Sequence, residues 1–223
     1  MTELMILKFL AIAALSYLIG SIPFGWLVVM IARGRDVRTL GSGRVGGTNV
    51  MRAAGCLAGV LTALLDAFKG VMALWAANWL LPGNPWAQAL GPLMAVVGQV
   101  LSVFLVERQT DGKLLFRGGA GGATTFGGLV ALWPPALIVV WPLAGLVFLL
   151  GGYASLTTIA VALSGLLALI YQAITGAGPW AHVLYGVGTL ILVLWALRSN
   201  LQRVRAGTER TVGLRAWRQK QGK

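Results

Sequence analysis

Three polar segments interrupt a strongly apolar chain, and the first has the composition of an anion-binding loop. Residues 40–52 combine four glycines with hydroxyl, amide and guanidinium groups: Gly41, Gly43, Gly46, Gly47, Ser42, Thr48, Asn49, Arg44 and Arg52. Glycines let backbone N–H groups approach an anion, and the side chains add neutral and forked cationic donors. A flexible connector is the alternative, but connectors rarely combine these residue types. We therefore predict an anion cradle.

The second segment, residues 116–128, is rich in glycine and leads directly into an apolar run. If that run is a helix, its free N–H groups and its dipole would attract a phosphate, and Thr124 and Thr125 would add hydroxyls. Close packing of membrane helices through small residues explains the same composition equally well. The composition of this segment alone leaves both interpretations open.

The third segment, residues 198–210, is cationic and also holds Asn200, Thr208 and Glu209. A lone glutamate among arginines is more often an ion-pair partner than a base. A basic helix that lies on anionic lipid has the same composition, so this alternative also stays open.

Two further charged residues, Asp66 and Lys69, lie inside an apolar run. They are three positions apart, which places them on one face of a helix. Charges within a membrane span cost about 2.5–3.5 kcal/mol each on insertion scales, so they normally pair or face a polar cavity. We predict a mutual ion pair next to the anion site. With 6 acidic residues and 1 histidine, the chain has too few ligands and bases for a convincing metal site or catalytic triad.

The overall composition indicates which elements must position these segments. Of the 223 residues, 57% are hydrophobic and 11% are charged, which excludes an ordinary soluble domain. Apolar runs of about 20 residues, long enough to cross the hydrocarbon core, recur along the chain, beginning with residues 4–31, 56–81 and 86–106. We predict one membrane domain over residues 1–197 and a basic tail over residues 198–223.

The basic residues assign sides to the connections between these runs. Sixteen of the 18 lie in the loop at residues 32–55, the loop at residues 107–120 and the tail. Basic loops stay in the cytoplasm, so the net charge of +12 indicates positive-inside orientation rather than nucleic-acid binding. Breaks at residues 133–135, 151–153 and 175–179 divide the later apolar stretch into four helices. We therefore predict an all-α membrane protein with seven transmembrane helices, its N-terminus outside and its C-terminus in the cytoplasm.

Taken in order, the polar segments resemble motifs of the bacterial acyl-phosphate-dependent glycerol-3-phosphate acyltransferases. The likeness covers nearly the whole chain and lies in residues 20–25, 41–52, 66–70, 116–128, 200–203 and 207–209. Members of that family have seven helices with these loops in the cytoplasm. The resemblance implies transfer of a fatty acyl group from acyl phosphate to the 1-hydroxyl of glycerol 3-phosphate. The product would be lysophosphatidic acid for phospholipid synthesis.

The resemblance also implies which residues form the site. It gives catalytic roles to Ser42, Arg52 and Asn200, and substrate contacts to Gly41, Gly43, Arg44, Thr48, Asn49, Lys69, Gly118, Gly119, Gly121, Thr124 and Glu209. No metal or other cofactor is expected, because acyl phosphate is already activated and a substrate phosphate could take the proton. We expect a monomer in the bacterial inner membrane that binds acyl phosphate, glycerol 3-phosphate and the lipid bilayer, and no nucleic acid.

The chain departs from the family pattern at several positions of the implied site. Ala120 and Leu197 stand where the family has lysine and histidine, and Gln99 replaces another histidine. Arg44 replaces an asparagine, and residues 107–115 look like an insertion. A charged hydrogen bond contributes about 1.5–3 kcal/mol, so loss of the lysine alone would slow the reaction roughly 10- to 150-fold. We expect Arg44 to restore part of the missing charge.

Three other functions fit parts of the sequence. Ala120 and Leu197 favour a catalytically weak or silent relative that binds phosphorylated lipid precursors or partner enzymes. Asp66 and Lys69 suggest a transporter, but the polar segments lie on one side rather than at a midplane site. A metal-dependent lipid-head transferase would need a cluster of aspartates, which the sequence lacks.

Overall fold

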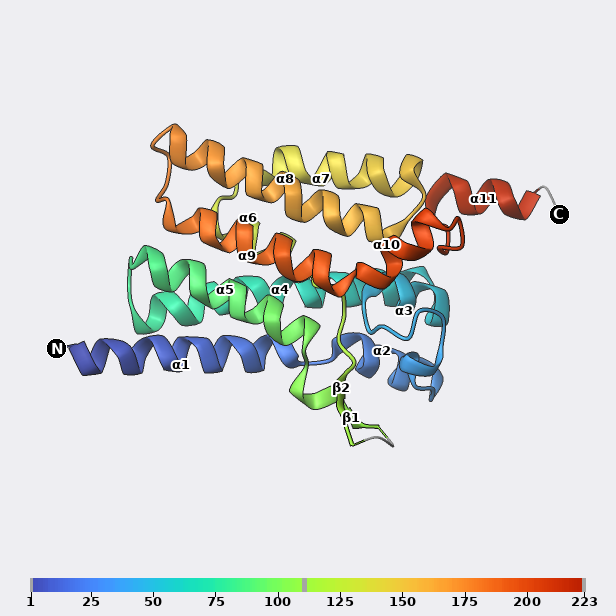
Figure 1. Cartoon of the computed structure of the whole chain (residues 1–223), viewed down its shortest axis with the longest axis horizontal. Coiled ribbons are helices and arrows are strands. Elements are labelled where there is room, and N and C mark those ends of the chain that lie inside the picture. Colours follow the sequence, from blue (N-terminus) through green and yellow to red (C-terminus); the bar gives the residue numbers. More distant parts are fainter. Residues whose placement is uncertain (1, 110–111, 222–223) are drawn as a thin grey trace.

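The computed structural model describes residues 2–109 and 112–221, which form a helical bundle with the two ends of the chain on opposite sides (Figure 1). Residues 1, 110–111 and 222–223, which belong to the expected domain, insertion and tail, lie outside the described residues. In chain order the elements are α1 Thr2–Ser21, α2 Phe24–Arg33, η1 Val37–Thr39, α3 Gly47–Ala54, α4 Cys56–Leu80, α5 Pro85–Val100, η2 Val103–Leu105, β1 Val106–Arg108, β2 Leu114–Phe116, α6 Gly122–Leu132, α7 Ala136–Leu146, η3 Val147–Gly151, α8 Ala154–Ile174, α9 Ala181–Ala196, α10 Arg198–Arg205 and α11 Gly213–Gln221.

Several of these helices are long and apolar enough to cross a membrane. Within the described residues there are four such stretches: Thr2–Arg33, Cys56–Leu80, Pro85–Leu105 and Ala154–Ile174. A fifth arises if α9 and α10, which are bent by 59°, count as one span, while α6 and the stretch Ala136–Gly151 are shorter apolar helices. The chain is therefore a multi-pass helical membrane protein. Each apolar run expected from the sequence contains a helix, although two of these helices are shorter than expected.

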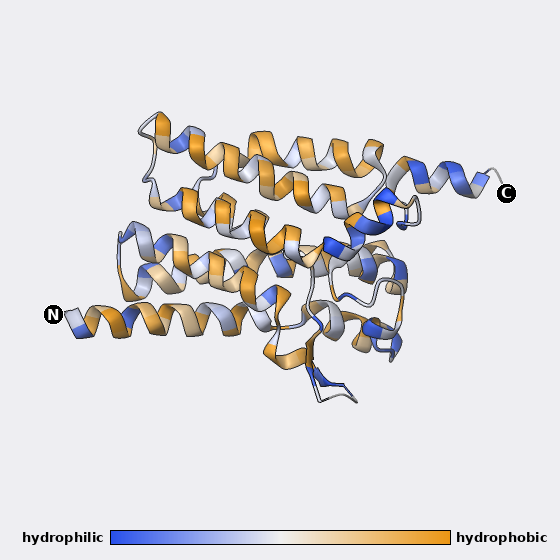
Figure 2. Cartoon of the chain, in the orientation of Figure 1, coloured by the Kyte–Doolittle hydropathy of each residue, from blue (hydrophilic) through white to orange (hydrophobic). Residues whose placement is uncertain are grey.

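Hydrophilic residues gather at the end of the bundle that carries the C-terminus (Figure 2). The predicted loops there contain secondary structure. Residues 32–55 include η1 and α3, and the second loop includes an antiparallel hairpin that pairs Val106 with Phe116. The hairpin is a small addition to a fold whose other described elements are helices. Helix formation in the first loop and strand pairing in the second give both segments regular backbone hydrogen bonds.

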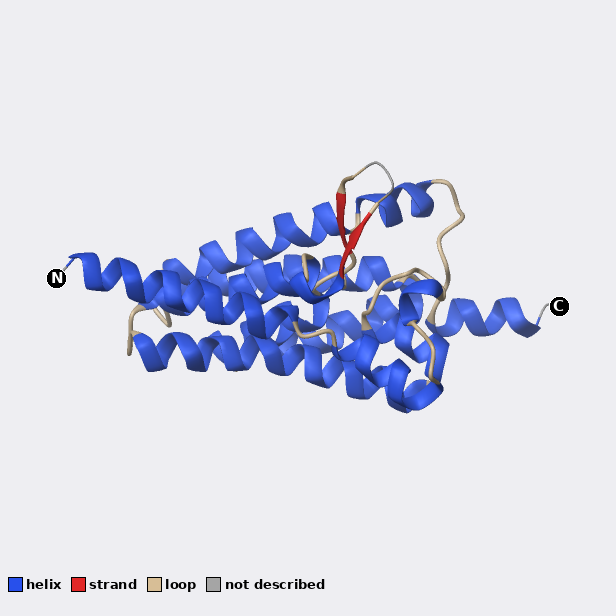
Figure 3. Ribbon diagram, turned by 90° about the horizontal axis from the view of Figure 1, so that it is seen from below, coloured by secondary structure: helices blue, strands red, loops and turns tan. Residues whose placement is uncertain are grey.

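The helix α5 ends earlier than predicted, at Val100 instead of residue 106. Contacts with α1 hold the chain in its new direction. Tyr17 donates its hydroxyl hydrogen to the carbonyl oxygen of Leu101 at 2.8 Å, and Ser102 donates to the carbonyl oxygen of Ser21 at 2.6 Å. The following residues then leave the bundle sideways as the hairpin, which both views show (Figure 1, Figure 3).

The first apolar run is broken into α1 and α2 at Pro23. Proline lacks an N–H group and keeps the preceding residue out of the helical region, so the regular ladder of hydrogen bonds stops here. The carbonyl oxygens of Gly20 and Ile22 instead accept hydrogen bonds from the Lys69 ammonium, at 3.1 and 2.8 Å. A side chain of α4 therefore supplies hydrogen bonds to the backbone carbonyl oxygens at the break in the first run.

Lys69 belongs to a buried polar network that joins three helices. Its ammonium lies 2.8 Å from Asp66 Oδ1 and donates to Gln99 Oε1, while Gln99 Nε2 donates to Asp66 Oδ2 at 2.9 Å. Ions buried in a protein cost several kcal/mol each unless they are paired and hydrogen-bonded. The predicted Asp66–Lys69 ion pair is thus present, and Gln99 joins it to α5.

Close contacts at glycines set the spacing between helices. A Cβ at Gly20 in α1 would lie 2.0 Å from the carbonyl oxygen of Ala95 in α5. A Cβ at Gly127 in α6 would lie 1.8 Å from the carbonyl oxygen of Ala67 in α4. Real Cβ atoms cannot occupy such positions, so α1 packs on α5, and α6 on α4, with backbone against backbone. The glycines late in the second segment therefore serve helix packing.

We predict that Gly127→Ala lowers the melting temperature in detergent by several degrees. The added methyl group would force α4 and α6 apart, and overpacking of this kind costs about 1–3 kcal/mol. Gly145→Ala in α7 is a matched control, because a Cβ at Gly145 meets no atom within 4 Å. Thermal unfolding of both variants checks the prediction, and an unchanged melting temperature for Gly127→Ala would contradict it.

Candidate functional site

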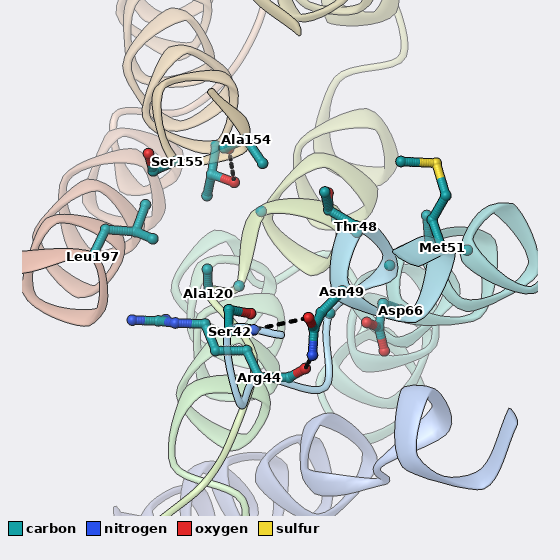
Figure 4. Close-up of a pocket in the computed structure, with 18 of the residues that line it drawn as sticks. Ser42, Arg44, Thr48, Asn49, Met51, Asp66, Ala120, Ala154, Ser155 and Leu197 are labelled. Carbon is teal, nitrogen blue, oxygen red and sulfur yellow. Dashed lines mark hydrogen bonds between the residues drawn. The ribbon is translucent and has the colours of Figure 1, made fainter. Parts of the chain in front are cut away.

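A cavity of about 280 Å³ lies at the hydrophilic end of the bundle, and all three polar segments contribute to its wall (Figure 4). We call it the first cavity. Its lining includes Ser42, Arg44, Gly46, Gly47, Thr48, Asn49 and Arg52 from the first segment, Ala120, Gly121 and Gly122 from the second, and Leu197, Asn200 and Glu209 at the third. The charge pattern had placed these segments on one side of the membrane, and the fold brings them into one cavity.

The side chain of Asn49 holds the first segment in place through hydrogen bonds to the backbone of the same loop. Its side chain is buried, and its Nδ2 donates to the carbonyl oxygens of Leu40 at 3.0 Å and Arg44 at 2.8 Å. Its Oδ1 accepts the N–H of Ser42 at 3.0 Å. Because the loop itself uses this amide, Asn49 positions Ser42 and Arg44 at the cavity.

The glycine spacing of the first segment follows from the turn around Asn49. Gly41 and Gly43 have φ angles of +57° and +72°, in the left-handed region that favours glycine. A Cβ at Gly41 would lie only 2.1 Å from Asn49 Oδ1. Gly41 lines neither this cavity nor its neighbour, so its contribution is to the shape of the loop.

The N-terminal end of α3 and the guanidinium of Arg52 supply positive electrostatic potential. Thr48 lies in the first turn of α3, where N–H groups have no helical acceptor and the helix dipole favours an anion. Arg52 lies in the last turn of α3 and donates to the carbonyl oxygen of Thr211 at 3.3 Å. Burial, helped by the nearby Arg210, lowers its pKa, but a guanidinium in a protein remains protonated.

Arg44 spans the distance from the first segment to the third. Its guanidinium donates to the carbonyl oxygen of Ala196, the last residue of α9. Burial, with the like charge of Arg203, lowers the pKa of Arg44 below the usual arginine value. Arg44 therefore holds a buried cation between the two segments, and it lines both this cavity and a neighbouring one.

The predicted residues of the second segment lie in different places. Gly121, with φ +84°, precedes α6 and lines the first cavity. Gly118 and Gly119 pack against the end of α5, where the Gly119 N–H donates to the carbonyl oxygen of Gln99 at 2.8 Å, and both line the neighbouring cavity instead. Thr124 is fully buried and Lys69 lies in its own network, and neither belongs to the described lining of these two cavities.

The third segment contributes an amide and a carboxylate that hold each other. Asn200 Nδ2 donates to Glu209 Oε1 at 2.9 Å, and Arg203 Nε donates to Glu209 Oε2 at 2.9 Å. The Glu209 carboxylate is thus an ion-pair partner, as the sequence had suggested. The Oδ1 atom of Asn200 is buried without a hydrogen-bond partner, which leaves it available to a ligand donor.

Sequence reasoning missed Ser155, which faces the first cavity from the first turn of α8 (Figure 4). Its side chain is 3% exposed and its Oγ has no hydrogen-bond partner. A buried hydroxyl without a partner is costly, so a ligand in the cavity would satisfy it. The signal was present in the sequence, because Ser155 comes two residues after the break at residues 151–153, which had been used only to count helices.

One wall of the first cavity is apolar. Ala120 and Leu197, which stand at the expected lysine and histidine positions, pack in one hydrophobic cluster with Val193 and Ala162. Leu197 is 2% exposed. The two departures from the family pattern therefore belong to the same apolar wall.

The first cavity can stabilise negative charge but has little capacity for acid–base chemistry. Arg44, Arg52 and the first turns of α3, α6 and α8 surround it. The two carboxylates in its described lining, Asp66 and Glu209, are already engaged with Lys69 and Arg203. Preorganised donors of this kind stabilise developing charge in a transition state. A phosphate-bearing ligand fits this arrangement.

Comparisons with known proteins likewise indicate a relation to proteins named for a phosphate-bearing substrate. The profile of the family described as glycerol-3-phosphate acyltransferase matches residues 10–207. Glycerol-3-phosphate acyltransferase 3 of Dehalococcoides mccartyi (strain ATCC BAA-2266 / KCTC 15142 / 195) is 37% identical over 93% of this chain and 97% of its own length. The glycerol-3-phosphate acyltransferase of Rubrobacter xylanophilus is 41% identical over 91% and 94%.

The crystal structure of PlsY (YgiH), an integral membrane glycerol 3-phosphate acyltransferase, has a similar fold. Its glycerol 3-phosphate form superposes with a TM-score of 0.78 and 30% identity, covering 92% of this chain and 96% of that one. Its lysophosphatidic acid form gives a TM-score of 0.76. The chain belongs to the glycerol-3-phosphate acyltransferase family.

Proposed function

We propose that this chain is an acyltransferase of phospholipid synthesis that moves a fatty acyl group from acyl phosphate to the 1-hydroxyl of glycerol 3-phosphate. The observation that carries the proposal is the first cavity, where Arg44, Arg52 and the start of α3 surround a space without a free carboxylate among its described residues. The names of the relatives, and the glycerol 3-phosphate and lysophosphatidic acid forms of PlsY, support it. No cofactor is required.

The chemistry follows from the donor set. The hydroxyl oxygen of glycerol 3-phosphate attacks the acyl carbonyl carbon, the bond from this carbon to the phosphate oxygen breaks, and inorganic phosphate leaves. The hydroxyl proton passes to a phosphate oxygen, so no protein base is needed. The protein holds the two phosphate groups close together against their mutual repulsion, and orients hydroxyl and carbonyl. Ser42, Arg52 and Asn200 are the residues to which we assign direct contacts with the reacting groups.

The proposed topology has seven crossings, with the N-terminus outside and the C-terminus in the cytoplasm of a bacterial cell. The basic segments at the hydrophilic end support the cytoplasmic side for the site. Counting seven requires α6 and α7 to cross although both are short. We further propose that the protein acts as a monomer, because a single chain supplies every segment of the first cavity.

We predict that Ser42→Ala slows synthesis of lysophosphatidic acid about 10- to 150-fold, the loss expected for one charge-assisted hydrogen bond. The assay uses purified protein in detergent with acyl phosphate and glycerol 3-phosphate. Ser16→Ala is the matched control, since Ser16 is buried in α1 outside the cavity and its Oγ has no partner. If wild type gives no more product than Ser42→Ala, the chain is instead a silent relative.

Arg44→Ala should lower kcat/KM by a similar factor, because it removes one of two guanidinium groups from the first cavity. Arg44→Lys should recover part of the rate by keeping the charge. Arg33→Ala, which removes an exposed arginine at the end of α2, is the control. An equal rate for Arg44→Ala and Arg33→Ala would show that Arg44 does not compensate for the missing lysine.

The double variant Ala120→Lys, Leu197→His should raise the rate roughly 10-fold or more, because it restores a charged donor to the apolar wall. Initial rates with both substrates and a melting curve are measured together, so that a loss of folding is recognised. A folded variant with an unchanged rate would mean that the hairpin and Arg44 have given this site a different arrangement.

A further inference from the structure

The connection between α10 and α11, residues 206–212, borders the first cavity, and we call it the strap. Glu209 of the strap lines the cavity. Two residues further on, the carbonyl oxygen of Thr211 accepts a hydrogen bond from the Arg52 guanidinium at 3.3 Å. Arg52 lines the same cavity from the last turn of α3. The strap therefore contacts the arginine to which the proposed reaction assigns a substrate contact.

Backbone contacts next to α8 hold the far end of the strap. Thr211 forms an isolated antiparallel bridge with Tyr153, the residue before α8, and the Val212 N–H donates to the carbonyl oxygen of Gly152 at 2.9 Å. The side chains of Val212 and Tyr153 are both buried. A single bridge is a weak attachment, because even a complete two-stranded hairpin is only marginally stable in water. The strap therefore depends on further contacts to stay in place.

The first turn of α11 supplies those contacts. The Arg215 guanidinium carbon lies 4.7 Å from the centroid of the Tyr153 ring, within the range of a cation–π interaction. Gly213 packs so closely on η3 that a Cβ there would lie 2.5 Å from the carbonyl oxygen of Phe148. We call the pair of Tyr153 and Arg215 the clasp, because it holds the start of α11, and with it the strap, against the start of α8.

The rest of α11 makes fewer contacts with the bundle. Leu214, Trp217 and Arg218 are exposed. A basic amphipathic helix of this kind could lie on anionic lipid. Both views instead show α11 running along the long direction of the bundle and away from it, rather than across it (Figure 1, Figure 3). On the proposed topology α11 therefore does not lie along the membrane surface, and attachment of the strap is the role that its contacts support.

We propose that the clasp of Tyr153 and Arg215 positions Arg52 for a phosphate-bearing ligand in the first cavity, through the strap carbonyl of Thr211. This inference rests on the proposed function. A guanidinium has five N–H donors, so the bond to Thr211 leaves others for phosphate. Because ordering a long side chain weakens binding, an arginine that is fixed beforehand binds more tightly. Tyr153 and Arg215 are outside the described lining of the cavity, so they are positioning residues.

The first test is binding of inorganic phosphate to the full-length protein in detergent, measured by calorimetry. Arg215→Gln and Tyr153→Leu should each weaken binding about 5-fold, because each removes one partner of the clasp. Arg215→Lys and Tyr153→Phe keep the cation and the ring, so they should bind within about 2-fold of wild type. Arg218→Gln is the matched control on α11, since Arg218 is exposed and outside the clasp. A wild-type protein that binds no phosphate would overturn the proposal.

A double-mutant cycle separates positioning from general stabilisation. In the background of Arg52→Ala, Arg215→Gln should cause almost no further loss of phosphate binding, because the clasp acts through Arg52. An equal loss with and without Arg52 would mean that the clasp only stabilises this end of the bundle, and would overturn the proposal. Melting curves of all variants are recorded alongside, so that a loss of folding is recognised.

A second measurement follows Arg52 itself. In ¹⁵N NMR spectra of the protein in detergent, the Nε–H signal of Arg52 is identified by its absence from Arg52→Ala. Its order parameter should fall in Arg215→Gln and stay unchanged in Arg218→Gln. If Arg52 is equally ordered in both variants, the clasp does not position it, whatever happens to phosphate binding.

Lysophosphatidic acid synthesis by the same preparations separates this inference from the proposed function. Arg215→Gln should lower kcat/KM about 5-fold, and Arg215→Lys should restore it. Normal synthesis by Arg215→Gln, with unchanged phosphate binding and an equally ordered Arg52, would overturn only the clasp. No synthesis by wild type, together with phosphate binding that depends on the clasp through Arg52, would overturn the transferase and uphold the clasp.

Discussion

The buried ammonium of Lys69 is the interaction on which the arrangement of the site depends. It donates to the carbonyl oxygens of Gly20 and Ile22 at the break between α1 and α2 and pairs with Asp66, while Gln99 bridges the pair to α5. Removing any one partner would leave a buried ion or carbonyl group without compensation, which is strongly destabilising. Because Asp66 and Gln99 also line the first cavity, the network that joins α1, α4 and α5 forms part of the cavity wall.

The site built on this network is electrostatic rather than acid–base in character. Its cations and helix N-termini surround a small space, and its carboxylates serve to hold neighbouring cations and amides. Asn49 has a similar positioning role in the first segment, where its side-chain amide fixes the turn that presents Ser42 and Arg44. Ala120 packs against the hydrophobic cluster that contains Leu197, which shows that the opposite wall is organised by packing. The positive charge of the first cavity therefore lies on the wall that contains Arg44, opposite the apolar wall.

Much of the organisation could be predicted from the sequence, because charge placement and helical periodicity are local signals. The grouping of the basic segments and the spacing of Asp66 and Lys69 gave the hydrophilic end and the ion pair. The α3 helix was missed because Gly46 and Gly47 were assigned to an anion-binding loop, although they form the start of a helix that packs on α4. The hairpin and the role of Ser155 depend on contacts between distant residues, such as Glu107 with Arg38, which sequence spacing does not show.

The early end of α5 has a consequence for where in the bilayer the two cavities lie. On the proposed topology, the 16 residues from Pro85 to Val100 rise about 24 Å, less than the roughly 30 Å thickness of the hydrocarbon core. The second segment meets α5 at Gln99, so both cavities lie at the level where α5 ends. Pulling a fatty chain into water costs about 0.8 kcal/mol for each CH₂ group. On the proposed function, a site at this depth would let the fatty chain of the donor stay in the membrane while only its head moves to the soluble acceptor.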